Sequence, residues 1–526
     1  MKSFHWFLIA LFALVLPALG KPPVADEESY LFMAETIADH PLRPYDWWRI
    51  WQPWGEAPAE ATYSFAHPPL HLWWLTLTRS IFPVGPAMRL VSAAPFLVLF
   101  AFSAHRLATR VTRHPNLALA FCLASPVMIL GLHDSWMIDL GFLAFSTASV
   151  ALYREALLVR DQIDRHKILL AGLFLGLAAS YKYPSLVLVF LFVFHLKKTG
   201  LLRHSAPLWA GFFGLFGAMQ AFLLFQYGEI HLFTALQSAS EIDRSAFSER
   251  TAGTLVRFGF ALSPLALLAS KQLWRLLPFG IAVGGVCVVI LGKGDLSTIP
   301  LLWLFFLASA GGAFLGRCLI AMWSSTTRKR RGDREDGLLL GTWVLLVLLS
   351  IALGHNHADS RYVLPALLPM SLLLVRSASQ ISGGKKGLQI GAYCWAAIAF
   401  LTALSDYKMA QETHTLVTQI TEKHPPGRFS AEWTARRDLE QAGWTFWHSS
   451  EPLEPGVQVL LFANAGSSSP PEAGILVEQL SSSSHFPLRV LDWKTDAGYH
   501  SEQLGRLPLT WGRGPLVEAL IYEVPQ

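Results

Sequence analysis

Apolar segments long enough to cross a membrane recur along the first four fifths of this chain of 526 residues. A helix needs about 20 mostly apolar residues to span the hydrocarbon core of a bilayer. Hydrophobic residues make up 52% of the chain, and charged residues make up only 15%, against roughly 25% in soluble domains. The sequence therefore predicts a polytopic α-helical membrane protein and excludes a water-soluble enzyme.

These segments predict about thirteen transmembrane helices. The first segment fits a cleavable signal peptide as well as a retained helix, because Lys2 precedes it and small residues end it. The stretch 168–196 is counted as two short helices, because a single helix there would move the arginine-rich loop 328–334 to the outer side. The segments are 4–20, 85–107, 116–133, 138–157, 168–180, 184–196, 205–226, 255–270, 276–292, 297–323, 337–354, 362–376 and 387–404.

Positive charge gives the orientation of these helices, since short cytoplasmic loops collect Lys and Arg. With thirteen helices, the short basic loops all fall on the cytoplasmic side, at 106–113, 160–167, 197–203, 271–275, 328–334 and 385–386. The outer segments are then 21–84, 134–137, 227–254, 293–296, 355–361 and everything after Leu404.

The chain divides into two predicted domains. Residues 1–404 form the transmembrane domain, and its first extracytoplasmic loop, 21–84, is unusually long. In residues 405–526 no long apolar segment remains, and short apolar stretches alternate with turns rich in Ser and Pro. We expect 405–526 to form a small soluble α/β domain on the extracytoplasmic side.

The sequence excludes several kinds of site. The four cysteines lie far apart in apolar segments, and no Cys or His spacing suits zinc. There is no glycine-rich phosphate loop and no HExxH sequence, so nothing indicates a nucleotide site or a zinc peptidase. The net charge of +5 reflects the short basic loops, so we expect membrane lipids and no nucleic acid as partners.

Two groups of acidic residues lie at the predicted outer surface. Asp26, Glu27 and Glu28 follow the first apolar segment; acids there complement a helix dipole, and a carboxylate can equally act as a general base. Asp139 lies just inside the fourth predicted helix. An ionisable group costs roughly 2.5–3.5 kcal/mol near the bilayer centre, so Asp139 requires a partner or a water-filled cavity.

Cationic side chains lie on the same predicted side. Lys182 separates two half-length apolar segments, and Arg361 and Tyr362 begin the twelfth predicted helix. Such cations either extend toward lipid headgroups or bind a phosphate, and the sequence alone favours neither role. His67 precedes two prolines, which fix its direction at the start of a helix.

A metal site has only a partial signal. His355 and His357 flank a single residue in the outer loop before the twelfth predicted helix. Zinc takes three or four protein ligands, and two histidines do not specify it. The sequence leaves a divalent metal ion open at this loop and predicts no other cofactor.

Five short motifs, taken in order, resemble those of a known enzyme family. They are 26–30 (DEESY), 67–70 (HPPL), 137–140 (MIDL), 181–184 (YKYP) and 361–365 (RYVLP). Their order and outer placement are similar to those of the membrane-embedded type C glycosyltransferases, in the branch of the protein O-mannosyltransferases and the lipid A aminoarabinose transferase. The sequence departs from several relatives at His67, where they have Lys, so the resemblance supports a phosphate-binding role more firmly at Lys182.

The resemblance implies transfer of a sugar from a polyprenyl-phosphate donor to an extracytoplasmic lipid, glycan or protein acceptor. It implies a mannosyltransferase-like enzyme of the bacterial inner membrane, with its first helix retained and its active site and C-terminal domain on the extracytoplasmic side. Asp26 would deprotonate the acceptor, with inversion at the sugar carbon, and Asp139 and Glu27 would assist it. The residues that would bind the donor phosphate are Lys182, Arg361, Tyr362 and His67.

Two other functions stay open from the residues alone. A secondary transporter would also have many helices and could use Asp139 and Lys182 as a coupling pair, although no internal repeat is detectable. A non-catalytic membrane scaffold could bind a glycan or a lipid-linked sugar. The variant Asp26→Asn separates these functions, because only the enzyme requires that carboxylate.

Overall fold

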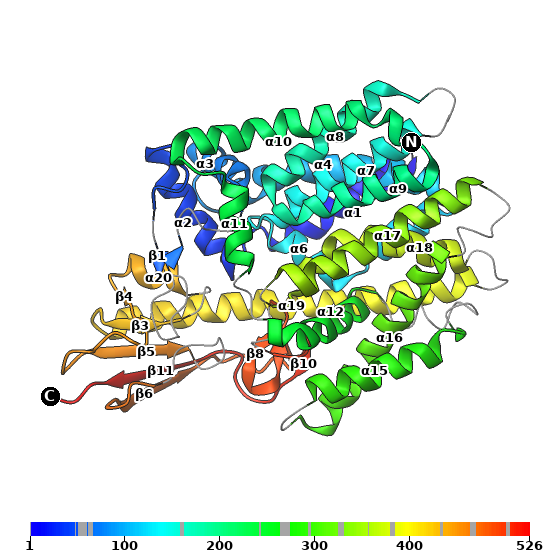
Figure 1. The fold of residues 1–526 in the computed structure, drawn as a ribbon. Helices are drawn as coiled ribbons and strands as arrows, with labels where there is room; N and C mark the ends of the chain where they lie inside the picture. The colour runs from blue at the N-terminus through cyan, green and yellow to red at the C-terminus, as the bar shows by residue number, and fades with distance from the viewer. Residues whose placement is uncertain are drawn as a thin grey trace. The chain divides into compact units, whose positions relative to one another are not determined.

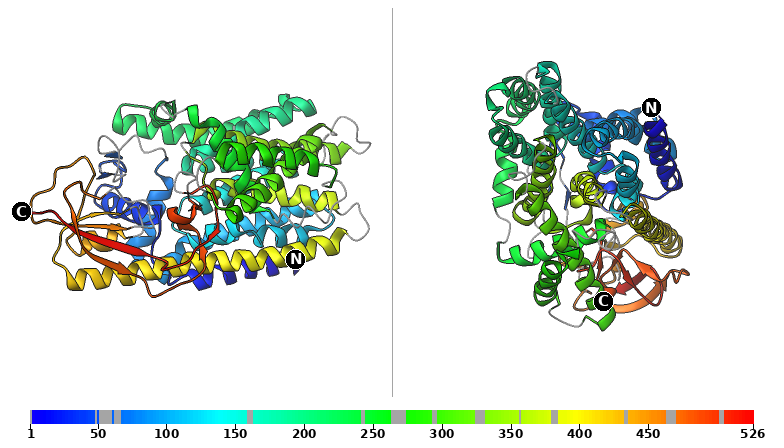
Figure 2. Two further views of the ribbon diagram at one scale, coloured as in Figure 1. Left: turned by 90° about the horizontal axis from the view of Figure 1, so that it is seen from below. Right: turned by 90° about the vertical axis from the view of Figure 1, so that its right-hand side faces the viewer.

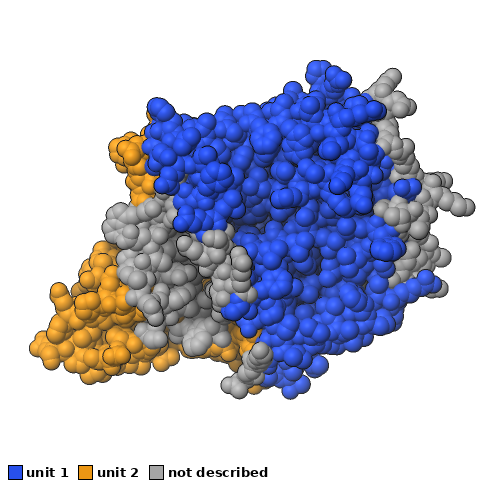
Figure 3. Space-filling view, viewed as in Figure 1, with its two compact units in different colours: residues 1–16, 66–71, 90–400 blue, residues 17–65, 72–89, 401–526 orange. Residues whose placement is uncertain are grey.

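The computed structural model describes residues 2–47, 49–50, 60–61, 67–157, 163–240, 244–262, 274–292, 296–323, 331–355, 357–378, 384–431, 435–462, 470–500 and 505–526. The chain forms two compact units (Figure 1; Figure 3). Unit 1 comprises 1–16, 66–71 and 90–400, and unit 2 comprises 17–65, 72–89 and 401–526.

Unit 1 is a bundle of helices, many of which run side by side (Figure 2). The helices α3 (Leu70–Ile81), α4 (Pro86–Val111) and α19 (Gly384–Lys423) contribute residues to both units. The other helices of unit 1 are α1 (Lys2–Val15), α5 (Pro115–Leu123), α6 (Pro126–His133), α7 (Asp139–Ala156), α8 (Arg165–Tyr181), α9 (Val187–Thr199), α10 (Ala206–Tyr227), α11 (His231–Ser240), α12 (Phe247–Ala261), α15 (Leu277–Leu291), α16 (Thr298–Trp323), α17 (Arg331–Gly354) and α18 (Leu364–Ala378).

Within the described residues, each predicted transmembrane segment contains a helix or a bent helix pair; residues 263–270 of the segment 255–270 lie outside the described residues. The segment 116–133 is such a pair, α5 and α6, which meet at an angle of 64°. Pro126 begins α6, and a proline interrupts the backbone hydrogen bonds of a continuous helix. The stretch 168–196 is divided as predicted, because α8 ends at Tyr181 and the 3₁₀ segment η3 (Tyr183–Leu186) precedes α9.

The protein is an integral membrane protein by the length and composition of its helices. Among the described residues, five helices are long and apolar enough to cross a membrane, or six if the α5–α6 pair is one span. The five lie at Pro86–Val111, Ala206–Tyr227, Thr298–Trp323, Gly332–Gly354 and Lys386–Lys423. The total of thirteen spans stays a prediction.

Glycines allow two pairs of helices in unit 1 to approach closely. A Cβ atom at Gly172 of α8 would lie 2.0 Å from the carbonyl oxygen of Leu208, and Gly211 of α10 meets the backbone of α8 equally directly. The helices α12 and α16 meet in the same way through Gly259 and Gly311. Small residues at such contacts let helix backbones pack together, which is typical of helices in membranes.

Unit 2 contains a mixed β-sheet with the strand order β4-β3-β5-β11-β6. The strand β3 (Arg428–Ser430) pairs in parallel with β4 (Thr445–Phe446) and β5 (Gln458–Phe462), and α20 (Arg436–Gln441) lies between β3 and β4 in sequence. The strand β11 (Glu518–Glu523) is antiparallel to β5 and to β6 (Ile475–Ser481). The sheet and α20 confirm the predicted α/β character of the C-terminal region.

Smaller elements complete unit 2. Its first helix is α2 (Asp26–Asp39). Two-stranded antiparallel sheets pair β1 (Arg49–Ile50) with β2 (Glu60–Ala61), β7 (Leu488–Arg489) with β10 (Thr510–Trp511), and β8 (Leu491–Asp492) with β9 (Ala497–Gly498). A buried hydrophobic cluster includes Val459 and Leu461 of β5 together with Trp447 and Val524.

Helix α19 continues past the predicted domain boundary at 404/405. It runs without interruption from Gly384 to Lys423, and its residues from Leu401 onward belong to unit 2. The division of the chain into a transmembrane domain 1–404 and a C-terminal domain 405–526 stays a prediction.

Candidate active site

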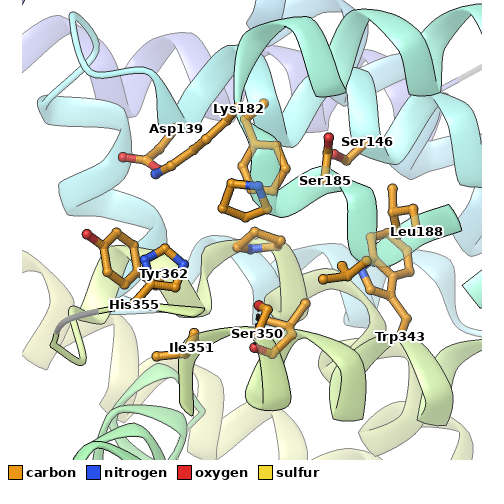
Figure 4. A pocket seen from close by; sticks show the side chains of 15 residues that line it. Asp139, Ser146, Lys182, Ser185, Leu188, Trp343, Ser350, Ile351, His355 and Tyr362 are labelled. Atoms are coloured by element: carbon orange, nitrogen blue, oxygen red, sulfur yellow. Dashed lines mark hydrogen bonds and ion pairs between the residues drawn. The ribbon is translucent and has the colours of Figure 1, made fainter. Parts of the chain in front are cut away.

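A pocket in unit 1 has a polar end and an apolar end (Figure 4). Its empty space, with open solvent included, is about 410 Å³. Asp139, Lys182, Tyr362 and His355 lie at one end, and Trp343 lies toward the other. The rest of the wall comes from α7, η3, α9, α17 and α18 through Phe142, Ser146, Pro184, Ser185, Val187, Leu188, Val347, Ser350, Ile351 and Pro365.

An ion pair between Lys182 and Asp139 forms the polar end. Nζ of Lys182 lies 2.6 Å from Oδ1 of Asp139, and the two side chains are only 4% and 5% exposed. The ammonium group also lies 5.0 Å from the centre of the Tyr362 ring. Within the described residues, Oδ2 of Asp139 has no hydrogen-bond partner. Lys182 is thus the partner that Asp139 requires at its buried position. The second carboxylate oxygen, Oδ2, can still accept a hydrogen bond.

The local backbone directs Lys182 toward Asp139. Lys182 directly follows α8 and has an extended conformation, with φ −153° and ψ 123°, so the side chains of its neighbours point away from its own. The hydroxyl of Tyr183 lies 2.6 Å from Nδ1 of His231, and Gln220 donates a hydrogen bond to the same hydroxyl. The hydroxyl of Tyr181 forms a hydrogen bond with Nδ1 of His71. Both tyrosines of the YKYP motif are therefore anchors for the lysine between them.

Arg361 lies beside the segment that leads to Asp139. The 3₁₀ segment η7 (Ser360–Val363) is capped by Asp359, whose carboxylate accepts hydrogen bonds from the backbone N–H and from Nε of Arg361. Nη1 of Arg361 contacts the sulfur of Met137, two residues before Asp139. Burial raises the pKa of Asp359 to about 7, against the opposing effect of the Arg361 charge.

Two histidines surround the ring of Tyr362. The ring of His355 lies 4.1 Å from that of Tyr362, and Nε2 of His357 lies 3.4 Å from its hydroxyl. Burial, followed by the Lys182 charge, lowers the pKa of His355 well below its ordinary value. Among the described residues no group of three or more His, Cys, Asp or Glu could hold a metal ion, so a metal at this loop stays a prediction.

The acidic group that follows α1 lies in unit 2, at the start of α2. Glu27 is fully buried, and Arg89 binds both of its oxygens, at 2.8 and 3.1 Å. The backbone N–H of Val24 also donates to Glu27. Asp26 is half-buried, and the residue before it, Ala25, has a positive φ of 46°. Left-handed backbone at a residue other than glycine stores strain and is frequent at functional sites.

Three further contacts fix the first outer segment within unit 2. Lys21 and Asp406 of α19 form a buried ion pair, which ties the residue after the first apolar segment to the last long helix. The backbone N–H of Arg437, in the first turn of α20, donates to Glu28. The Arg437 side chain lies 2.6 Å from Glu35 of α2. The start of α2 is thus held by the ion pair of Glu27 with Arg89 and by the backbone hydrogen bond from Arg437 to Glu28.

The structure brings together only some of the predicted site residues. Asp139, Lys182, Tyr362 and His355 line one pocket, and Arg361 lies next to Tyr362. His67 is half-buried in unit 1 at the start of α3. Asp26 and Glu27 belong to unit 2, and a chamber that they share with Asp139 stays a prediction.

Three buried polar residues were not expected from the sequence. His71, four residues after His67, contacts Trp136 and Tyr181 in unit 1. Arg89 binds Glu27, and Asp359 binds Arg361. The sequence does contain a signal for His71, because this residue directly follows the HPPL motif and lies one helical turn after His67. The other two lack any sequence signal for burial.

Comparisons with known proteins give a likeness to solved structures and no match to a protein family or a curated protein. A solved structure that is similar is the crystal structure of ArnT from Cupriavidus metallidurans bound to undecaprenyl phosphate. The match has 15% sequence identity and a TM-score of 0.43, and it covers 87% of this chain and 92% of that chain. At these values the likeness assigns neither a function nor site residues to this chain.

Proposed function

We propose that this protein is a membrane glycosyltransferase that moves a sugar from a polyprenyl-phosphate donor to an acceptor hydroxyl. The active site and the C-terminal domain lie on the extracytoplasmic side of a bacterial inner membrane, as the distribution of basic loops predicts. The acceptor is a lipid, a glycan or a protein.

One observation carries the proposal, which is the buried pair of Asp139 and Lys182 at the polar end of a pocket whose remaining wall is mostly apolar, with three serines. A lipid phosphate carries charge at one end and hydrocarbon at the other, so its two parts match the two ends of such a pocket. Taking ions out of water costs several kcal/mol per ion, and a buried pair is therefore weak evidence for stability alone. The pair is better explained by a function that uses the two charges.

Lys182 and Arg361 suit the leaving group of the reaction. When the bond between the anomeric carbon and the phosphate oxygen breaks, the diester becomes a monoester with one more negative charge. Two nearby cations offset that growing charge, and they do so more strongly in a pocket that excludes water. Lys182 can leave Oδ1 of Asp139 for the phosphate, and Asp139 then holds a second donor such as the acceptor hydroxyl.

Asp26 is the proposed base. The acceptor oxygen forms a bond to the anomeric carbon, its proton passes to the Asp26 carboxylate, and polyprenyl phosphate leaves. Glu27 is fully buried with both oxygens bound by Arg89. We therefore assign Glu27 a positioning role, which fixes the first turn of α2, and leave the proton transfer to the half-buried Asp26.

The test is a transfer assay with purified protein and a panel of radiolabelled polyprenyl-phosphate sugars. Label should appear in an extracted lipid, glycan or protein with the wild type, and should be absent with Asp26→Asn and with Lys182→Ala. The matched control is Asp39→Asn, which changes an exposed acid at the other end of the same helix and should leave transfer unchanged.

Two outcomes would contradict the proposal. Absence of transfer from every donor would leave a binding protein or a transporter. Transfer that survives Asp26→Asn at the wild-type rate would remove Asp26 from the mechanism. A transporter that uses Asp139 and Lys182 would move substrate across vesicles normally with Asp26→Asn and would lose transport with Asp139→Asn.

A further inference from the structure

His71 lies between the two segments that carry the ion pair of the pocket. Its Nε2 is 2.8 Å from the carbonyl oxygen of Trp136, and its Nδ1 is 2.8 Å from the hydroxyl of Tyr181. Trp136 precedes Asp139 by three residues, and Tyr181 directly precedes Lys182. One imidazole ring thus bridges the chain next to each member of the pair, and all these residues belong to unit 1.

The chemistry of the two contacts defines the tautomer of His71. A carbonyl oxygen only accepts hydrogen bonds, so Nε2 carries the proton and donates it to Trp136. Nδ1 then has a lone pair and accepts the hydrogen bond from the Tyr181 hydroxyl. Burial lowers the pKa of His71 to about 4, which agrees with a neutral ring. Both ring nitrogens are therefore used, and His71, only 2% exposed, has no capacity left for a substrate.

Close packing fixes the ring that His71 holds. A Cβ atom at Gly141, in the first turn of α7, would lie 2.4 Å from the Tyr181 ring, so that ring rests directly on the helix backbone beside Asp139. The rings of Phe96 and Phe145 meet Tyr181 edge to face, at centroid distances of 5.5 and 5.6 Å. The position of Tyr181 is thereby set against α7, and His71 adds the link to Trp136.

We propose that His71 is the positioning residue that sets the geometry of the Asp139–Lys182 pair. It does so through Tyr181 on the lysine side and through the Trp136 carbonyl on the aspartate side. The structural role of His71 does not depend on the proposed function. Only the purpose of that role rests on it, namely to keep a cation and a carboxylate in place for a lipid phosphate. A site that is held in its productive geometry before binding loses less conformational entropy when the ligand binds.

The first test measures the pair itself and needs no sugar transfer. Purified protein is treated with a small amine-acylating reagent, and labelling of each lysine is followed by mass spectrometry. In the wild type, Lys182 should react slowly because it is buried and paired. His71→Phe and Tyr181→Phe should each raise its labelling rate roughly two- to tenfold, the range given by loss of one hydrogen bond. Asp139→Asn removes the paired charge altogether, so it gives the upper limit of the Lys182 labelling rate.

Lys21 is the matched control within the same protein. It is also buried and ion-paired, with Asp406, but it lies in unit 2. Its labelling should not change in either variant. A parallel rise at Lys21 would indicate general loosening and would overturn the inference, as would an unchanged rate at Lys182. Tyr181→Phe removes a single oxygen atom, so it keeps the test valid if His71→Phe fails to fold.

A double variant tests whether the two contacts act in series. If His71 holds Tyr181, then His71→Phe/Tyr181→Phe should label Lys182 no faster than His71→Phe alone. Additive effects would mean that the two side chains act independently, against the proposal. In the transfer assay both single variants should lower kcat more than they raise KM. If the wild type transfers no sugar, the proposed function fails, while the labelling result still decides the role of His71.

Discussion

Lys182 donates a hydrogen bond to Oδ1 of Asp139 at 2.6 Å, in a pocket where both side chains are almost fully buried. The lysine directly follows the last residue of α8 and the aspartate begins α7, so the pair fixes the ends of two neighbouring helices relative to each other.

The first prediction concerns the stability of this pair. Lys182→Met leaves the Asp139 carboxylate buried without its cation, and we expect the free energy of unfolding to fall by about 3–5 kcal/mol. The double variant Lys182→Met/Asp139→Leu removes both charges and should recover most of that loss. Denaturation in mixed micelles measures both effects. Equal destabilisation in the single and double variants would show that the charges are not coupled.

A second prediction concerns the opposite end of α7. Asp336 of α17 accepts hydrogen bonds from Arg154 of α7 at 2.6 Å and from Arg376 of α18 at 2.9 Å. Asp336→Asn leaves the largely buried Arg154 guanidinium without its carboxylate and removes the buried one of the two carboxylates that bind Arg376, so we expect a loss of about 3–5 kcal/mol.

The control for Asp336 is Asp333, which also binds Arg376. Its side chain is 53% exposed, so Asp333→Asn should cost less than about 1 kcal/mol. The same denaturation experiment compares the two variants. A loss at Asp333 as large as that at Asp336 would mean that burial does not determine the strength of these pairs.

The helices of unit 1 were largely predictable because apolar segments and helix ends leave local signals. Gly200 and Gly228, with φ of 71° and 77°, end α9 and α10 within a few residues of the predicted positions. The break between α5 and α6 was missed, although Pro126 lies inside the predicted segment 116–133. The segment was predicted from its length and apolar composition alone, and neither property indicates a break in the helix.

The arrangement of the site was less predictable. Asp139 and Lys182 could be named from separate motifs, but their contact depends on how α7 packs against α8. The role of His71 depends on a backbone carbonyl, that of Trp136, and no residue type marks a carbonyl that accepts a side-chain hydrogen bond. The resemblance implies Asp26 as the base with Glu27 assisting it, and nothing in the sequence indicates that both terminal nitrogens of Arg89 bind Glu27.

The third prediction separates Asp26 from Glu27. Glu27→Gln breaks a fully buried pair with Arg89, and we expect it to lower the free energy of unfolding by about 3–5 kcal/mol. Asp26→Asn should change stability by less than about 1 kcal/mol and should abolish transfer, since it removes the proposed base. Glu35→Gln, at a partly exposed acid of the same helix, is the stability control for Glu27. A large loss of stability in Asp26→Asn, with transfer retained, would reverse the two assignments.

The last prediction is a dependence of stability on pH that comes from Asp359. Burial raises its pKa to about 7 in the folded protein, above the usual carboxyl value of about 3.9. Between these two values the folded state binds a proton that the unfolded state has lost, so this group's contribution to the free energy of unfolding decreases as pH rises from about 4 to about 7. Above pH 7 the contribution is constant, because both states are then ionised.

Asp359→Asn removes this titration while it keeps the shape of the side chain. The free energy of unfolding is measured for the wild type and for the variant from pH 4.5 to 8. The value for the wild type minus the value for the variant should decrease up to about pH 7 and then stay constant. Asp492→Asn, at a buried acid of unit 2, is the comparison variant, since burial also raises the pKa of that carboxyl. A difference for Asp359 that is flat over the whole range would show that Arg361 keeps the carboxylate ionised and that the pair is charged at every pH tested.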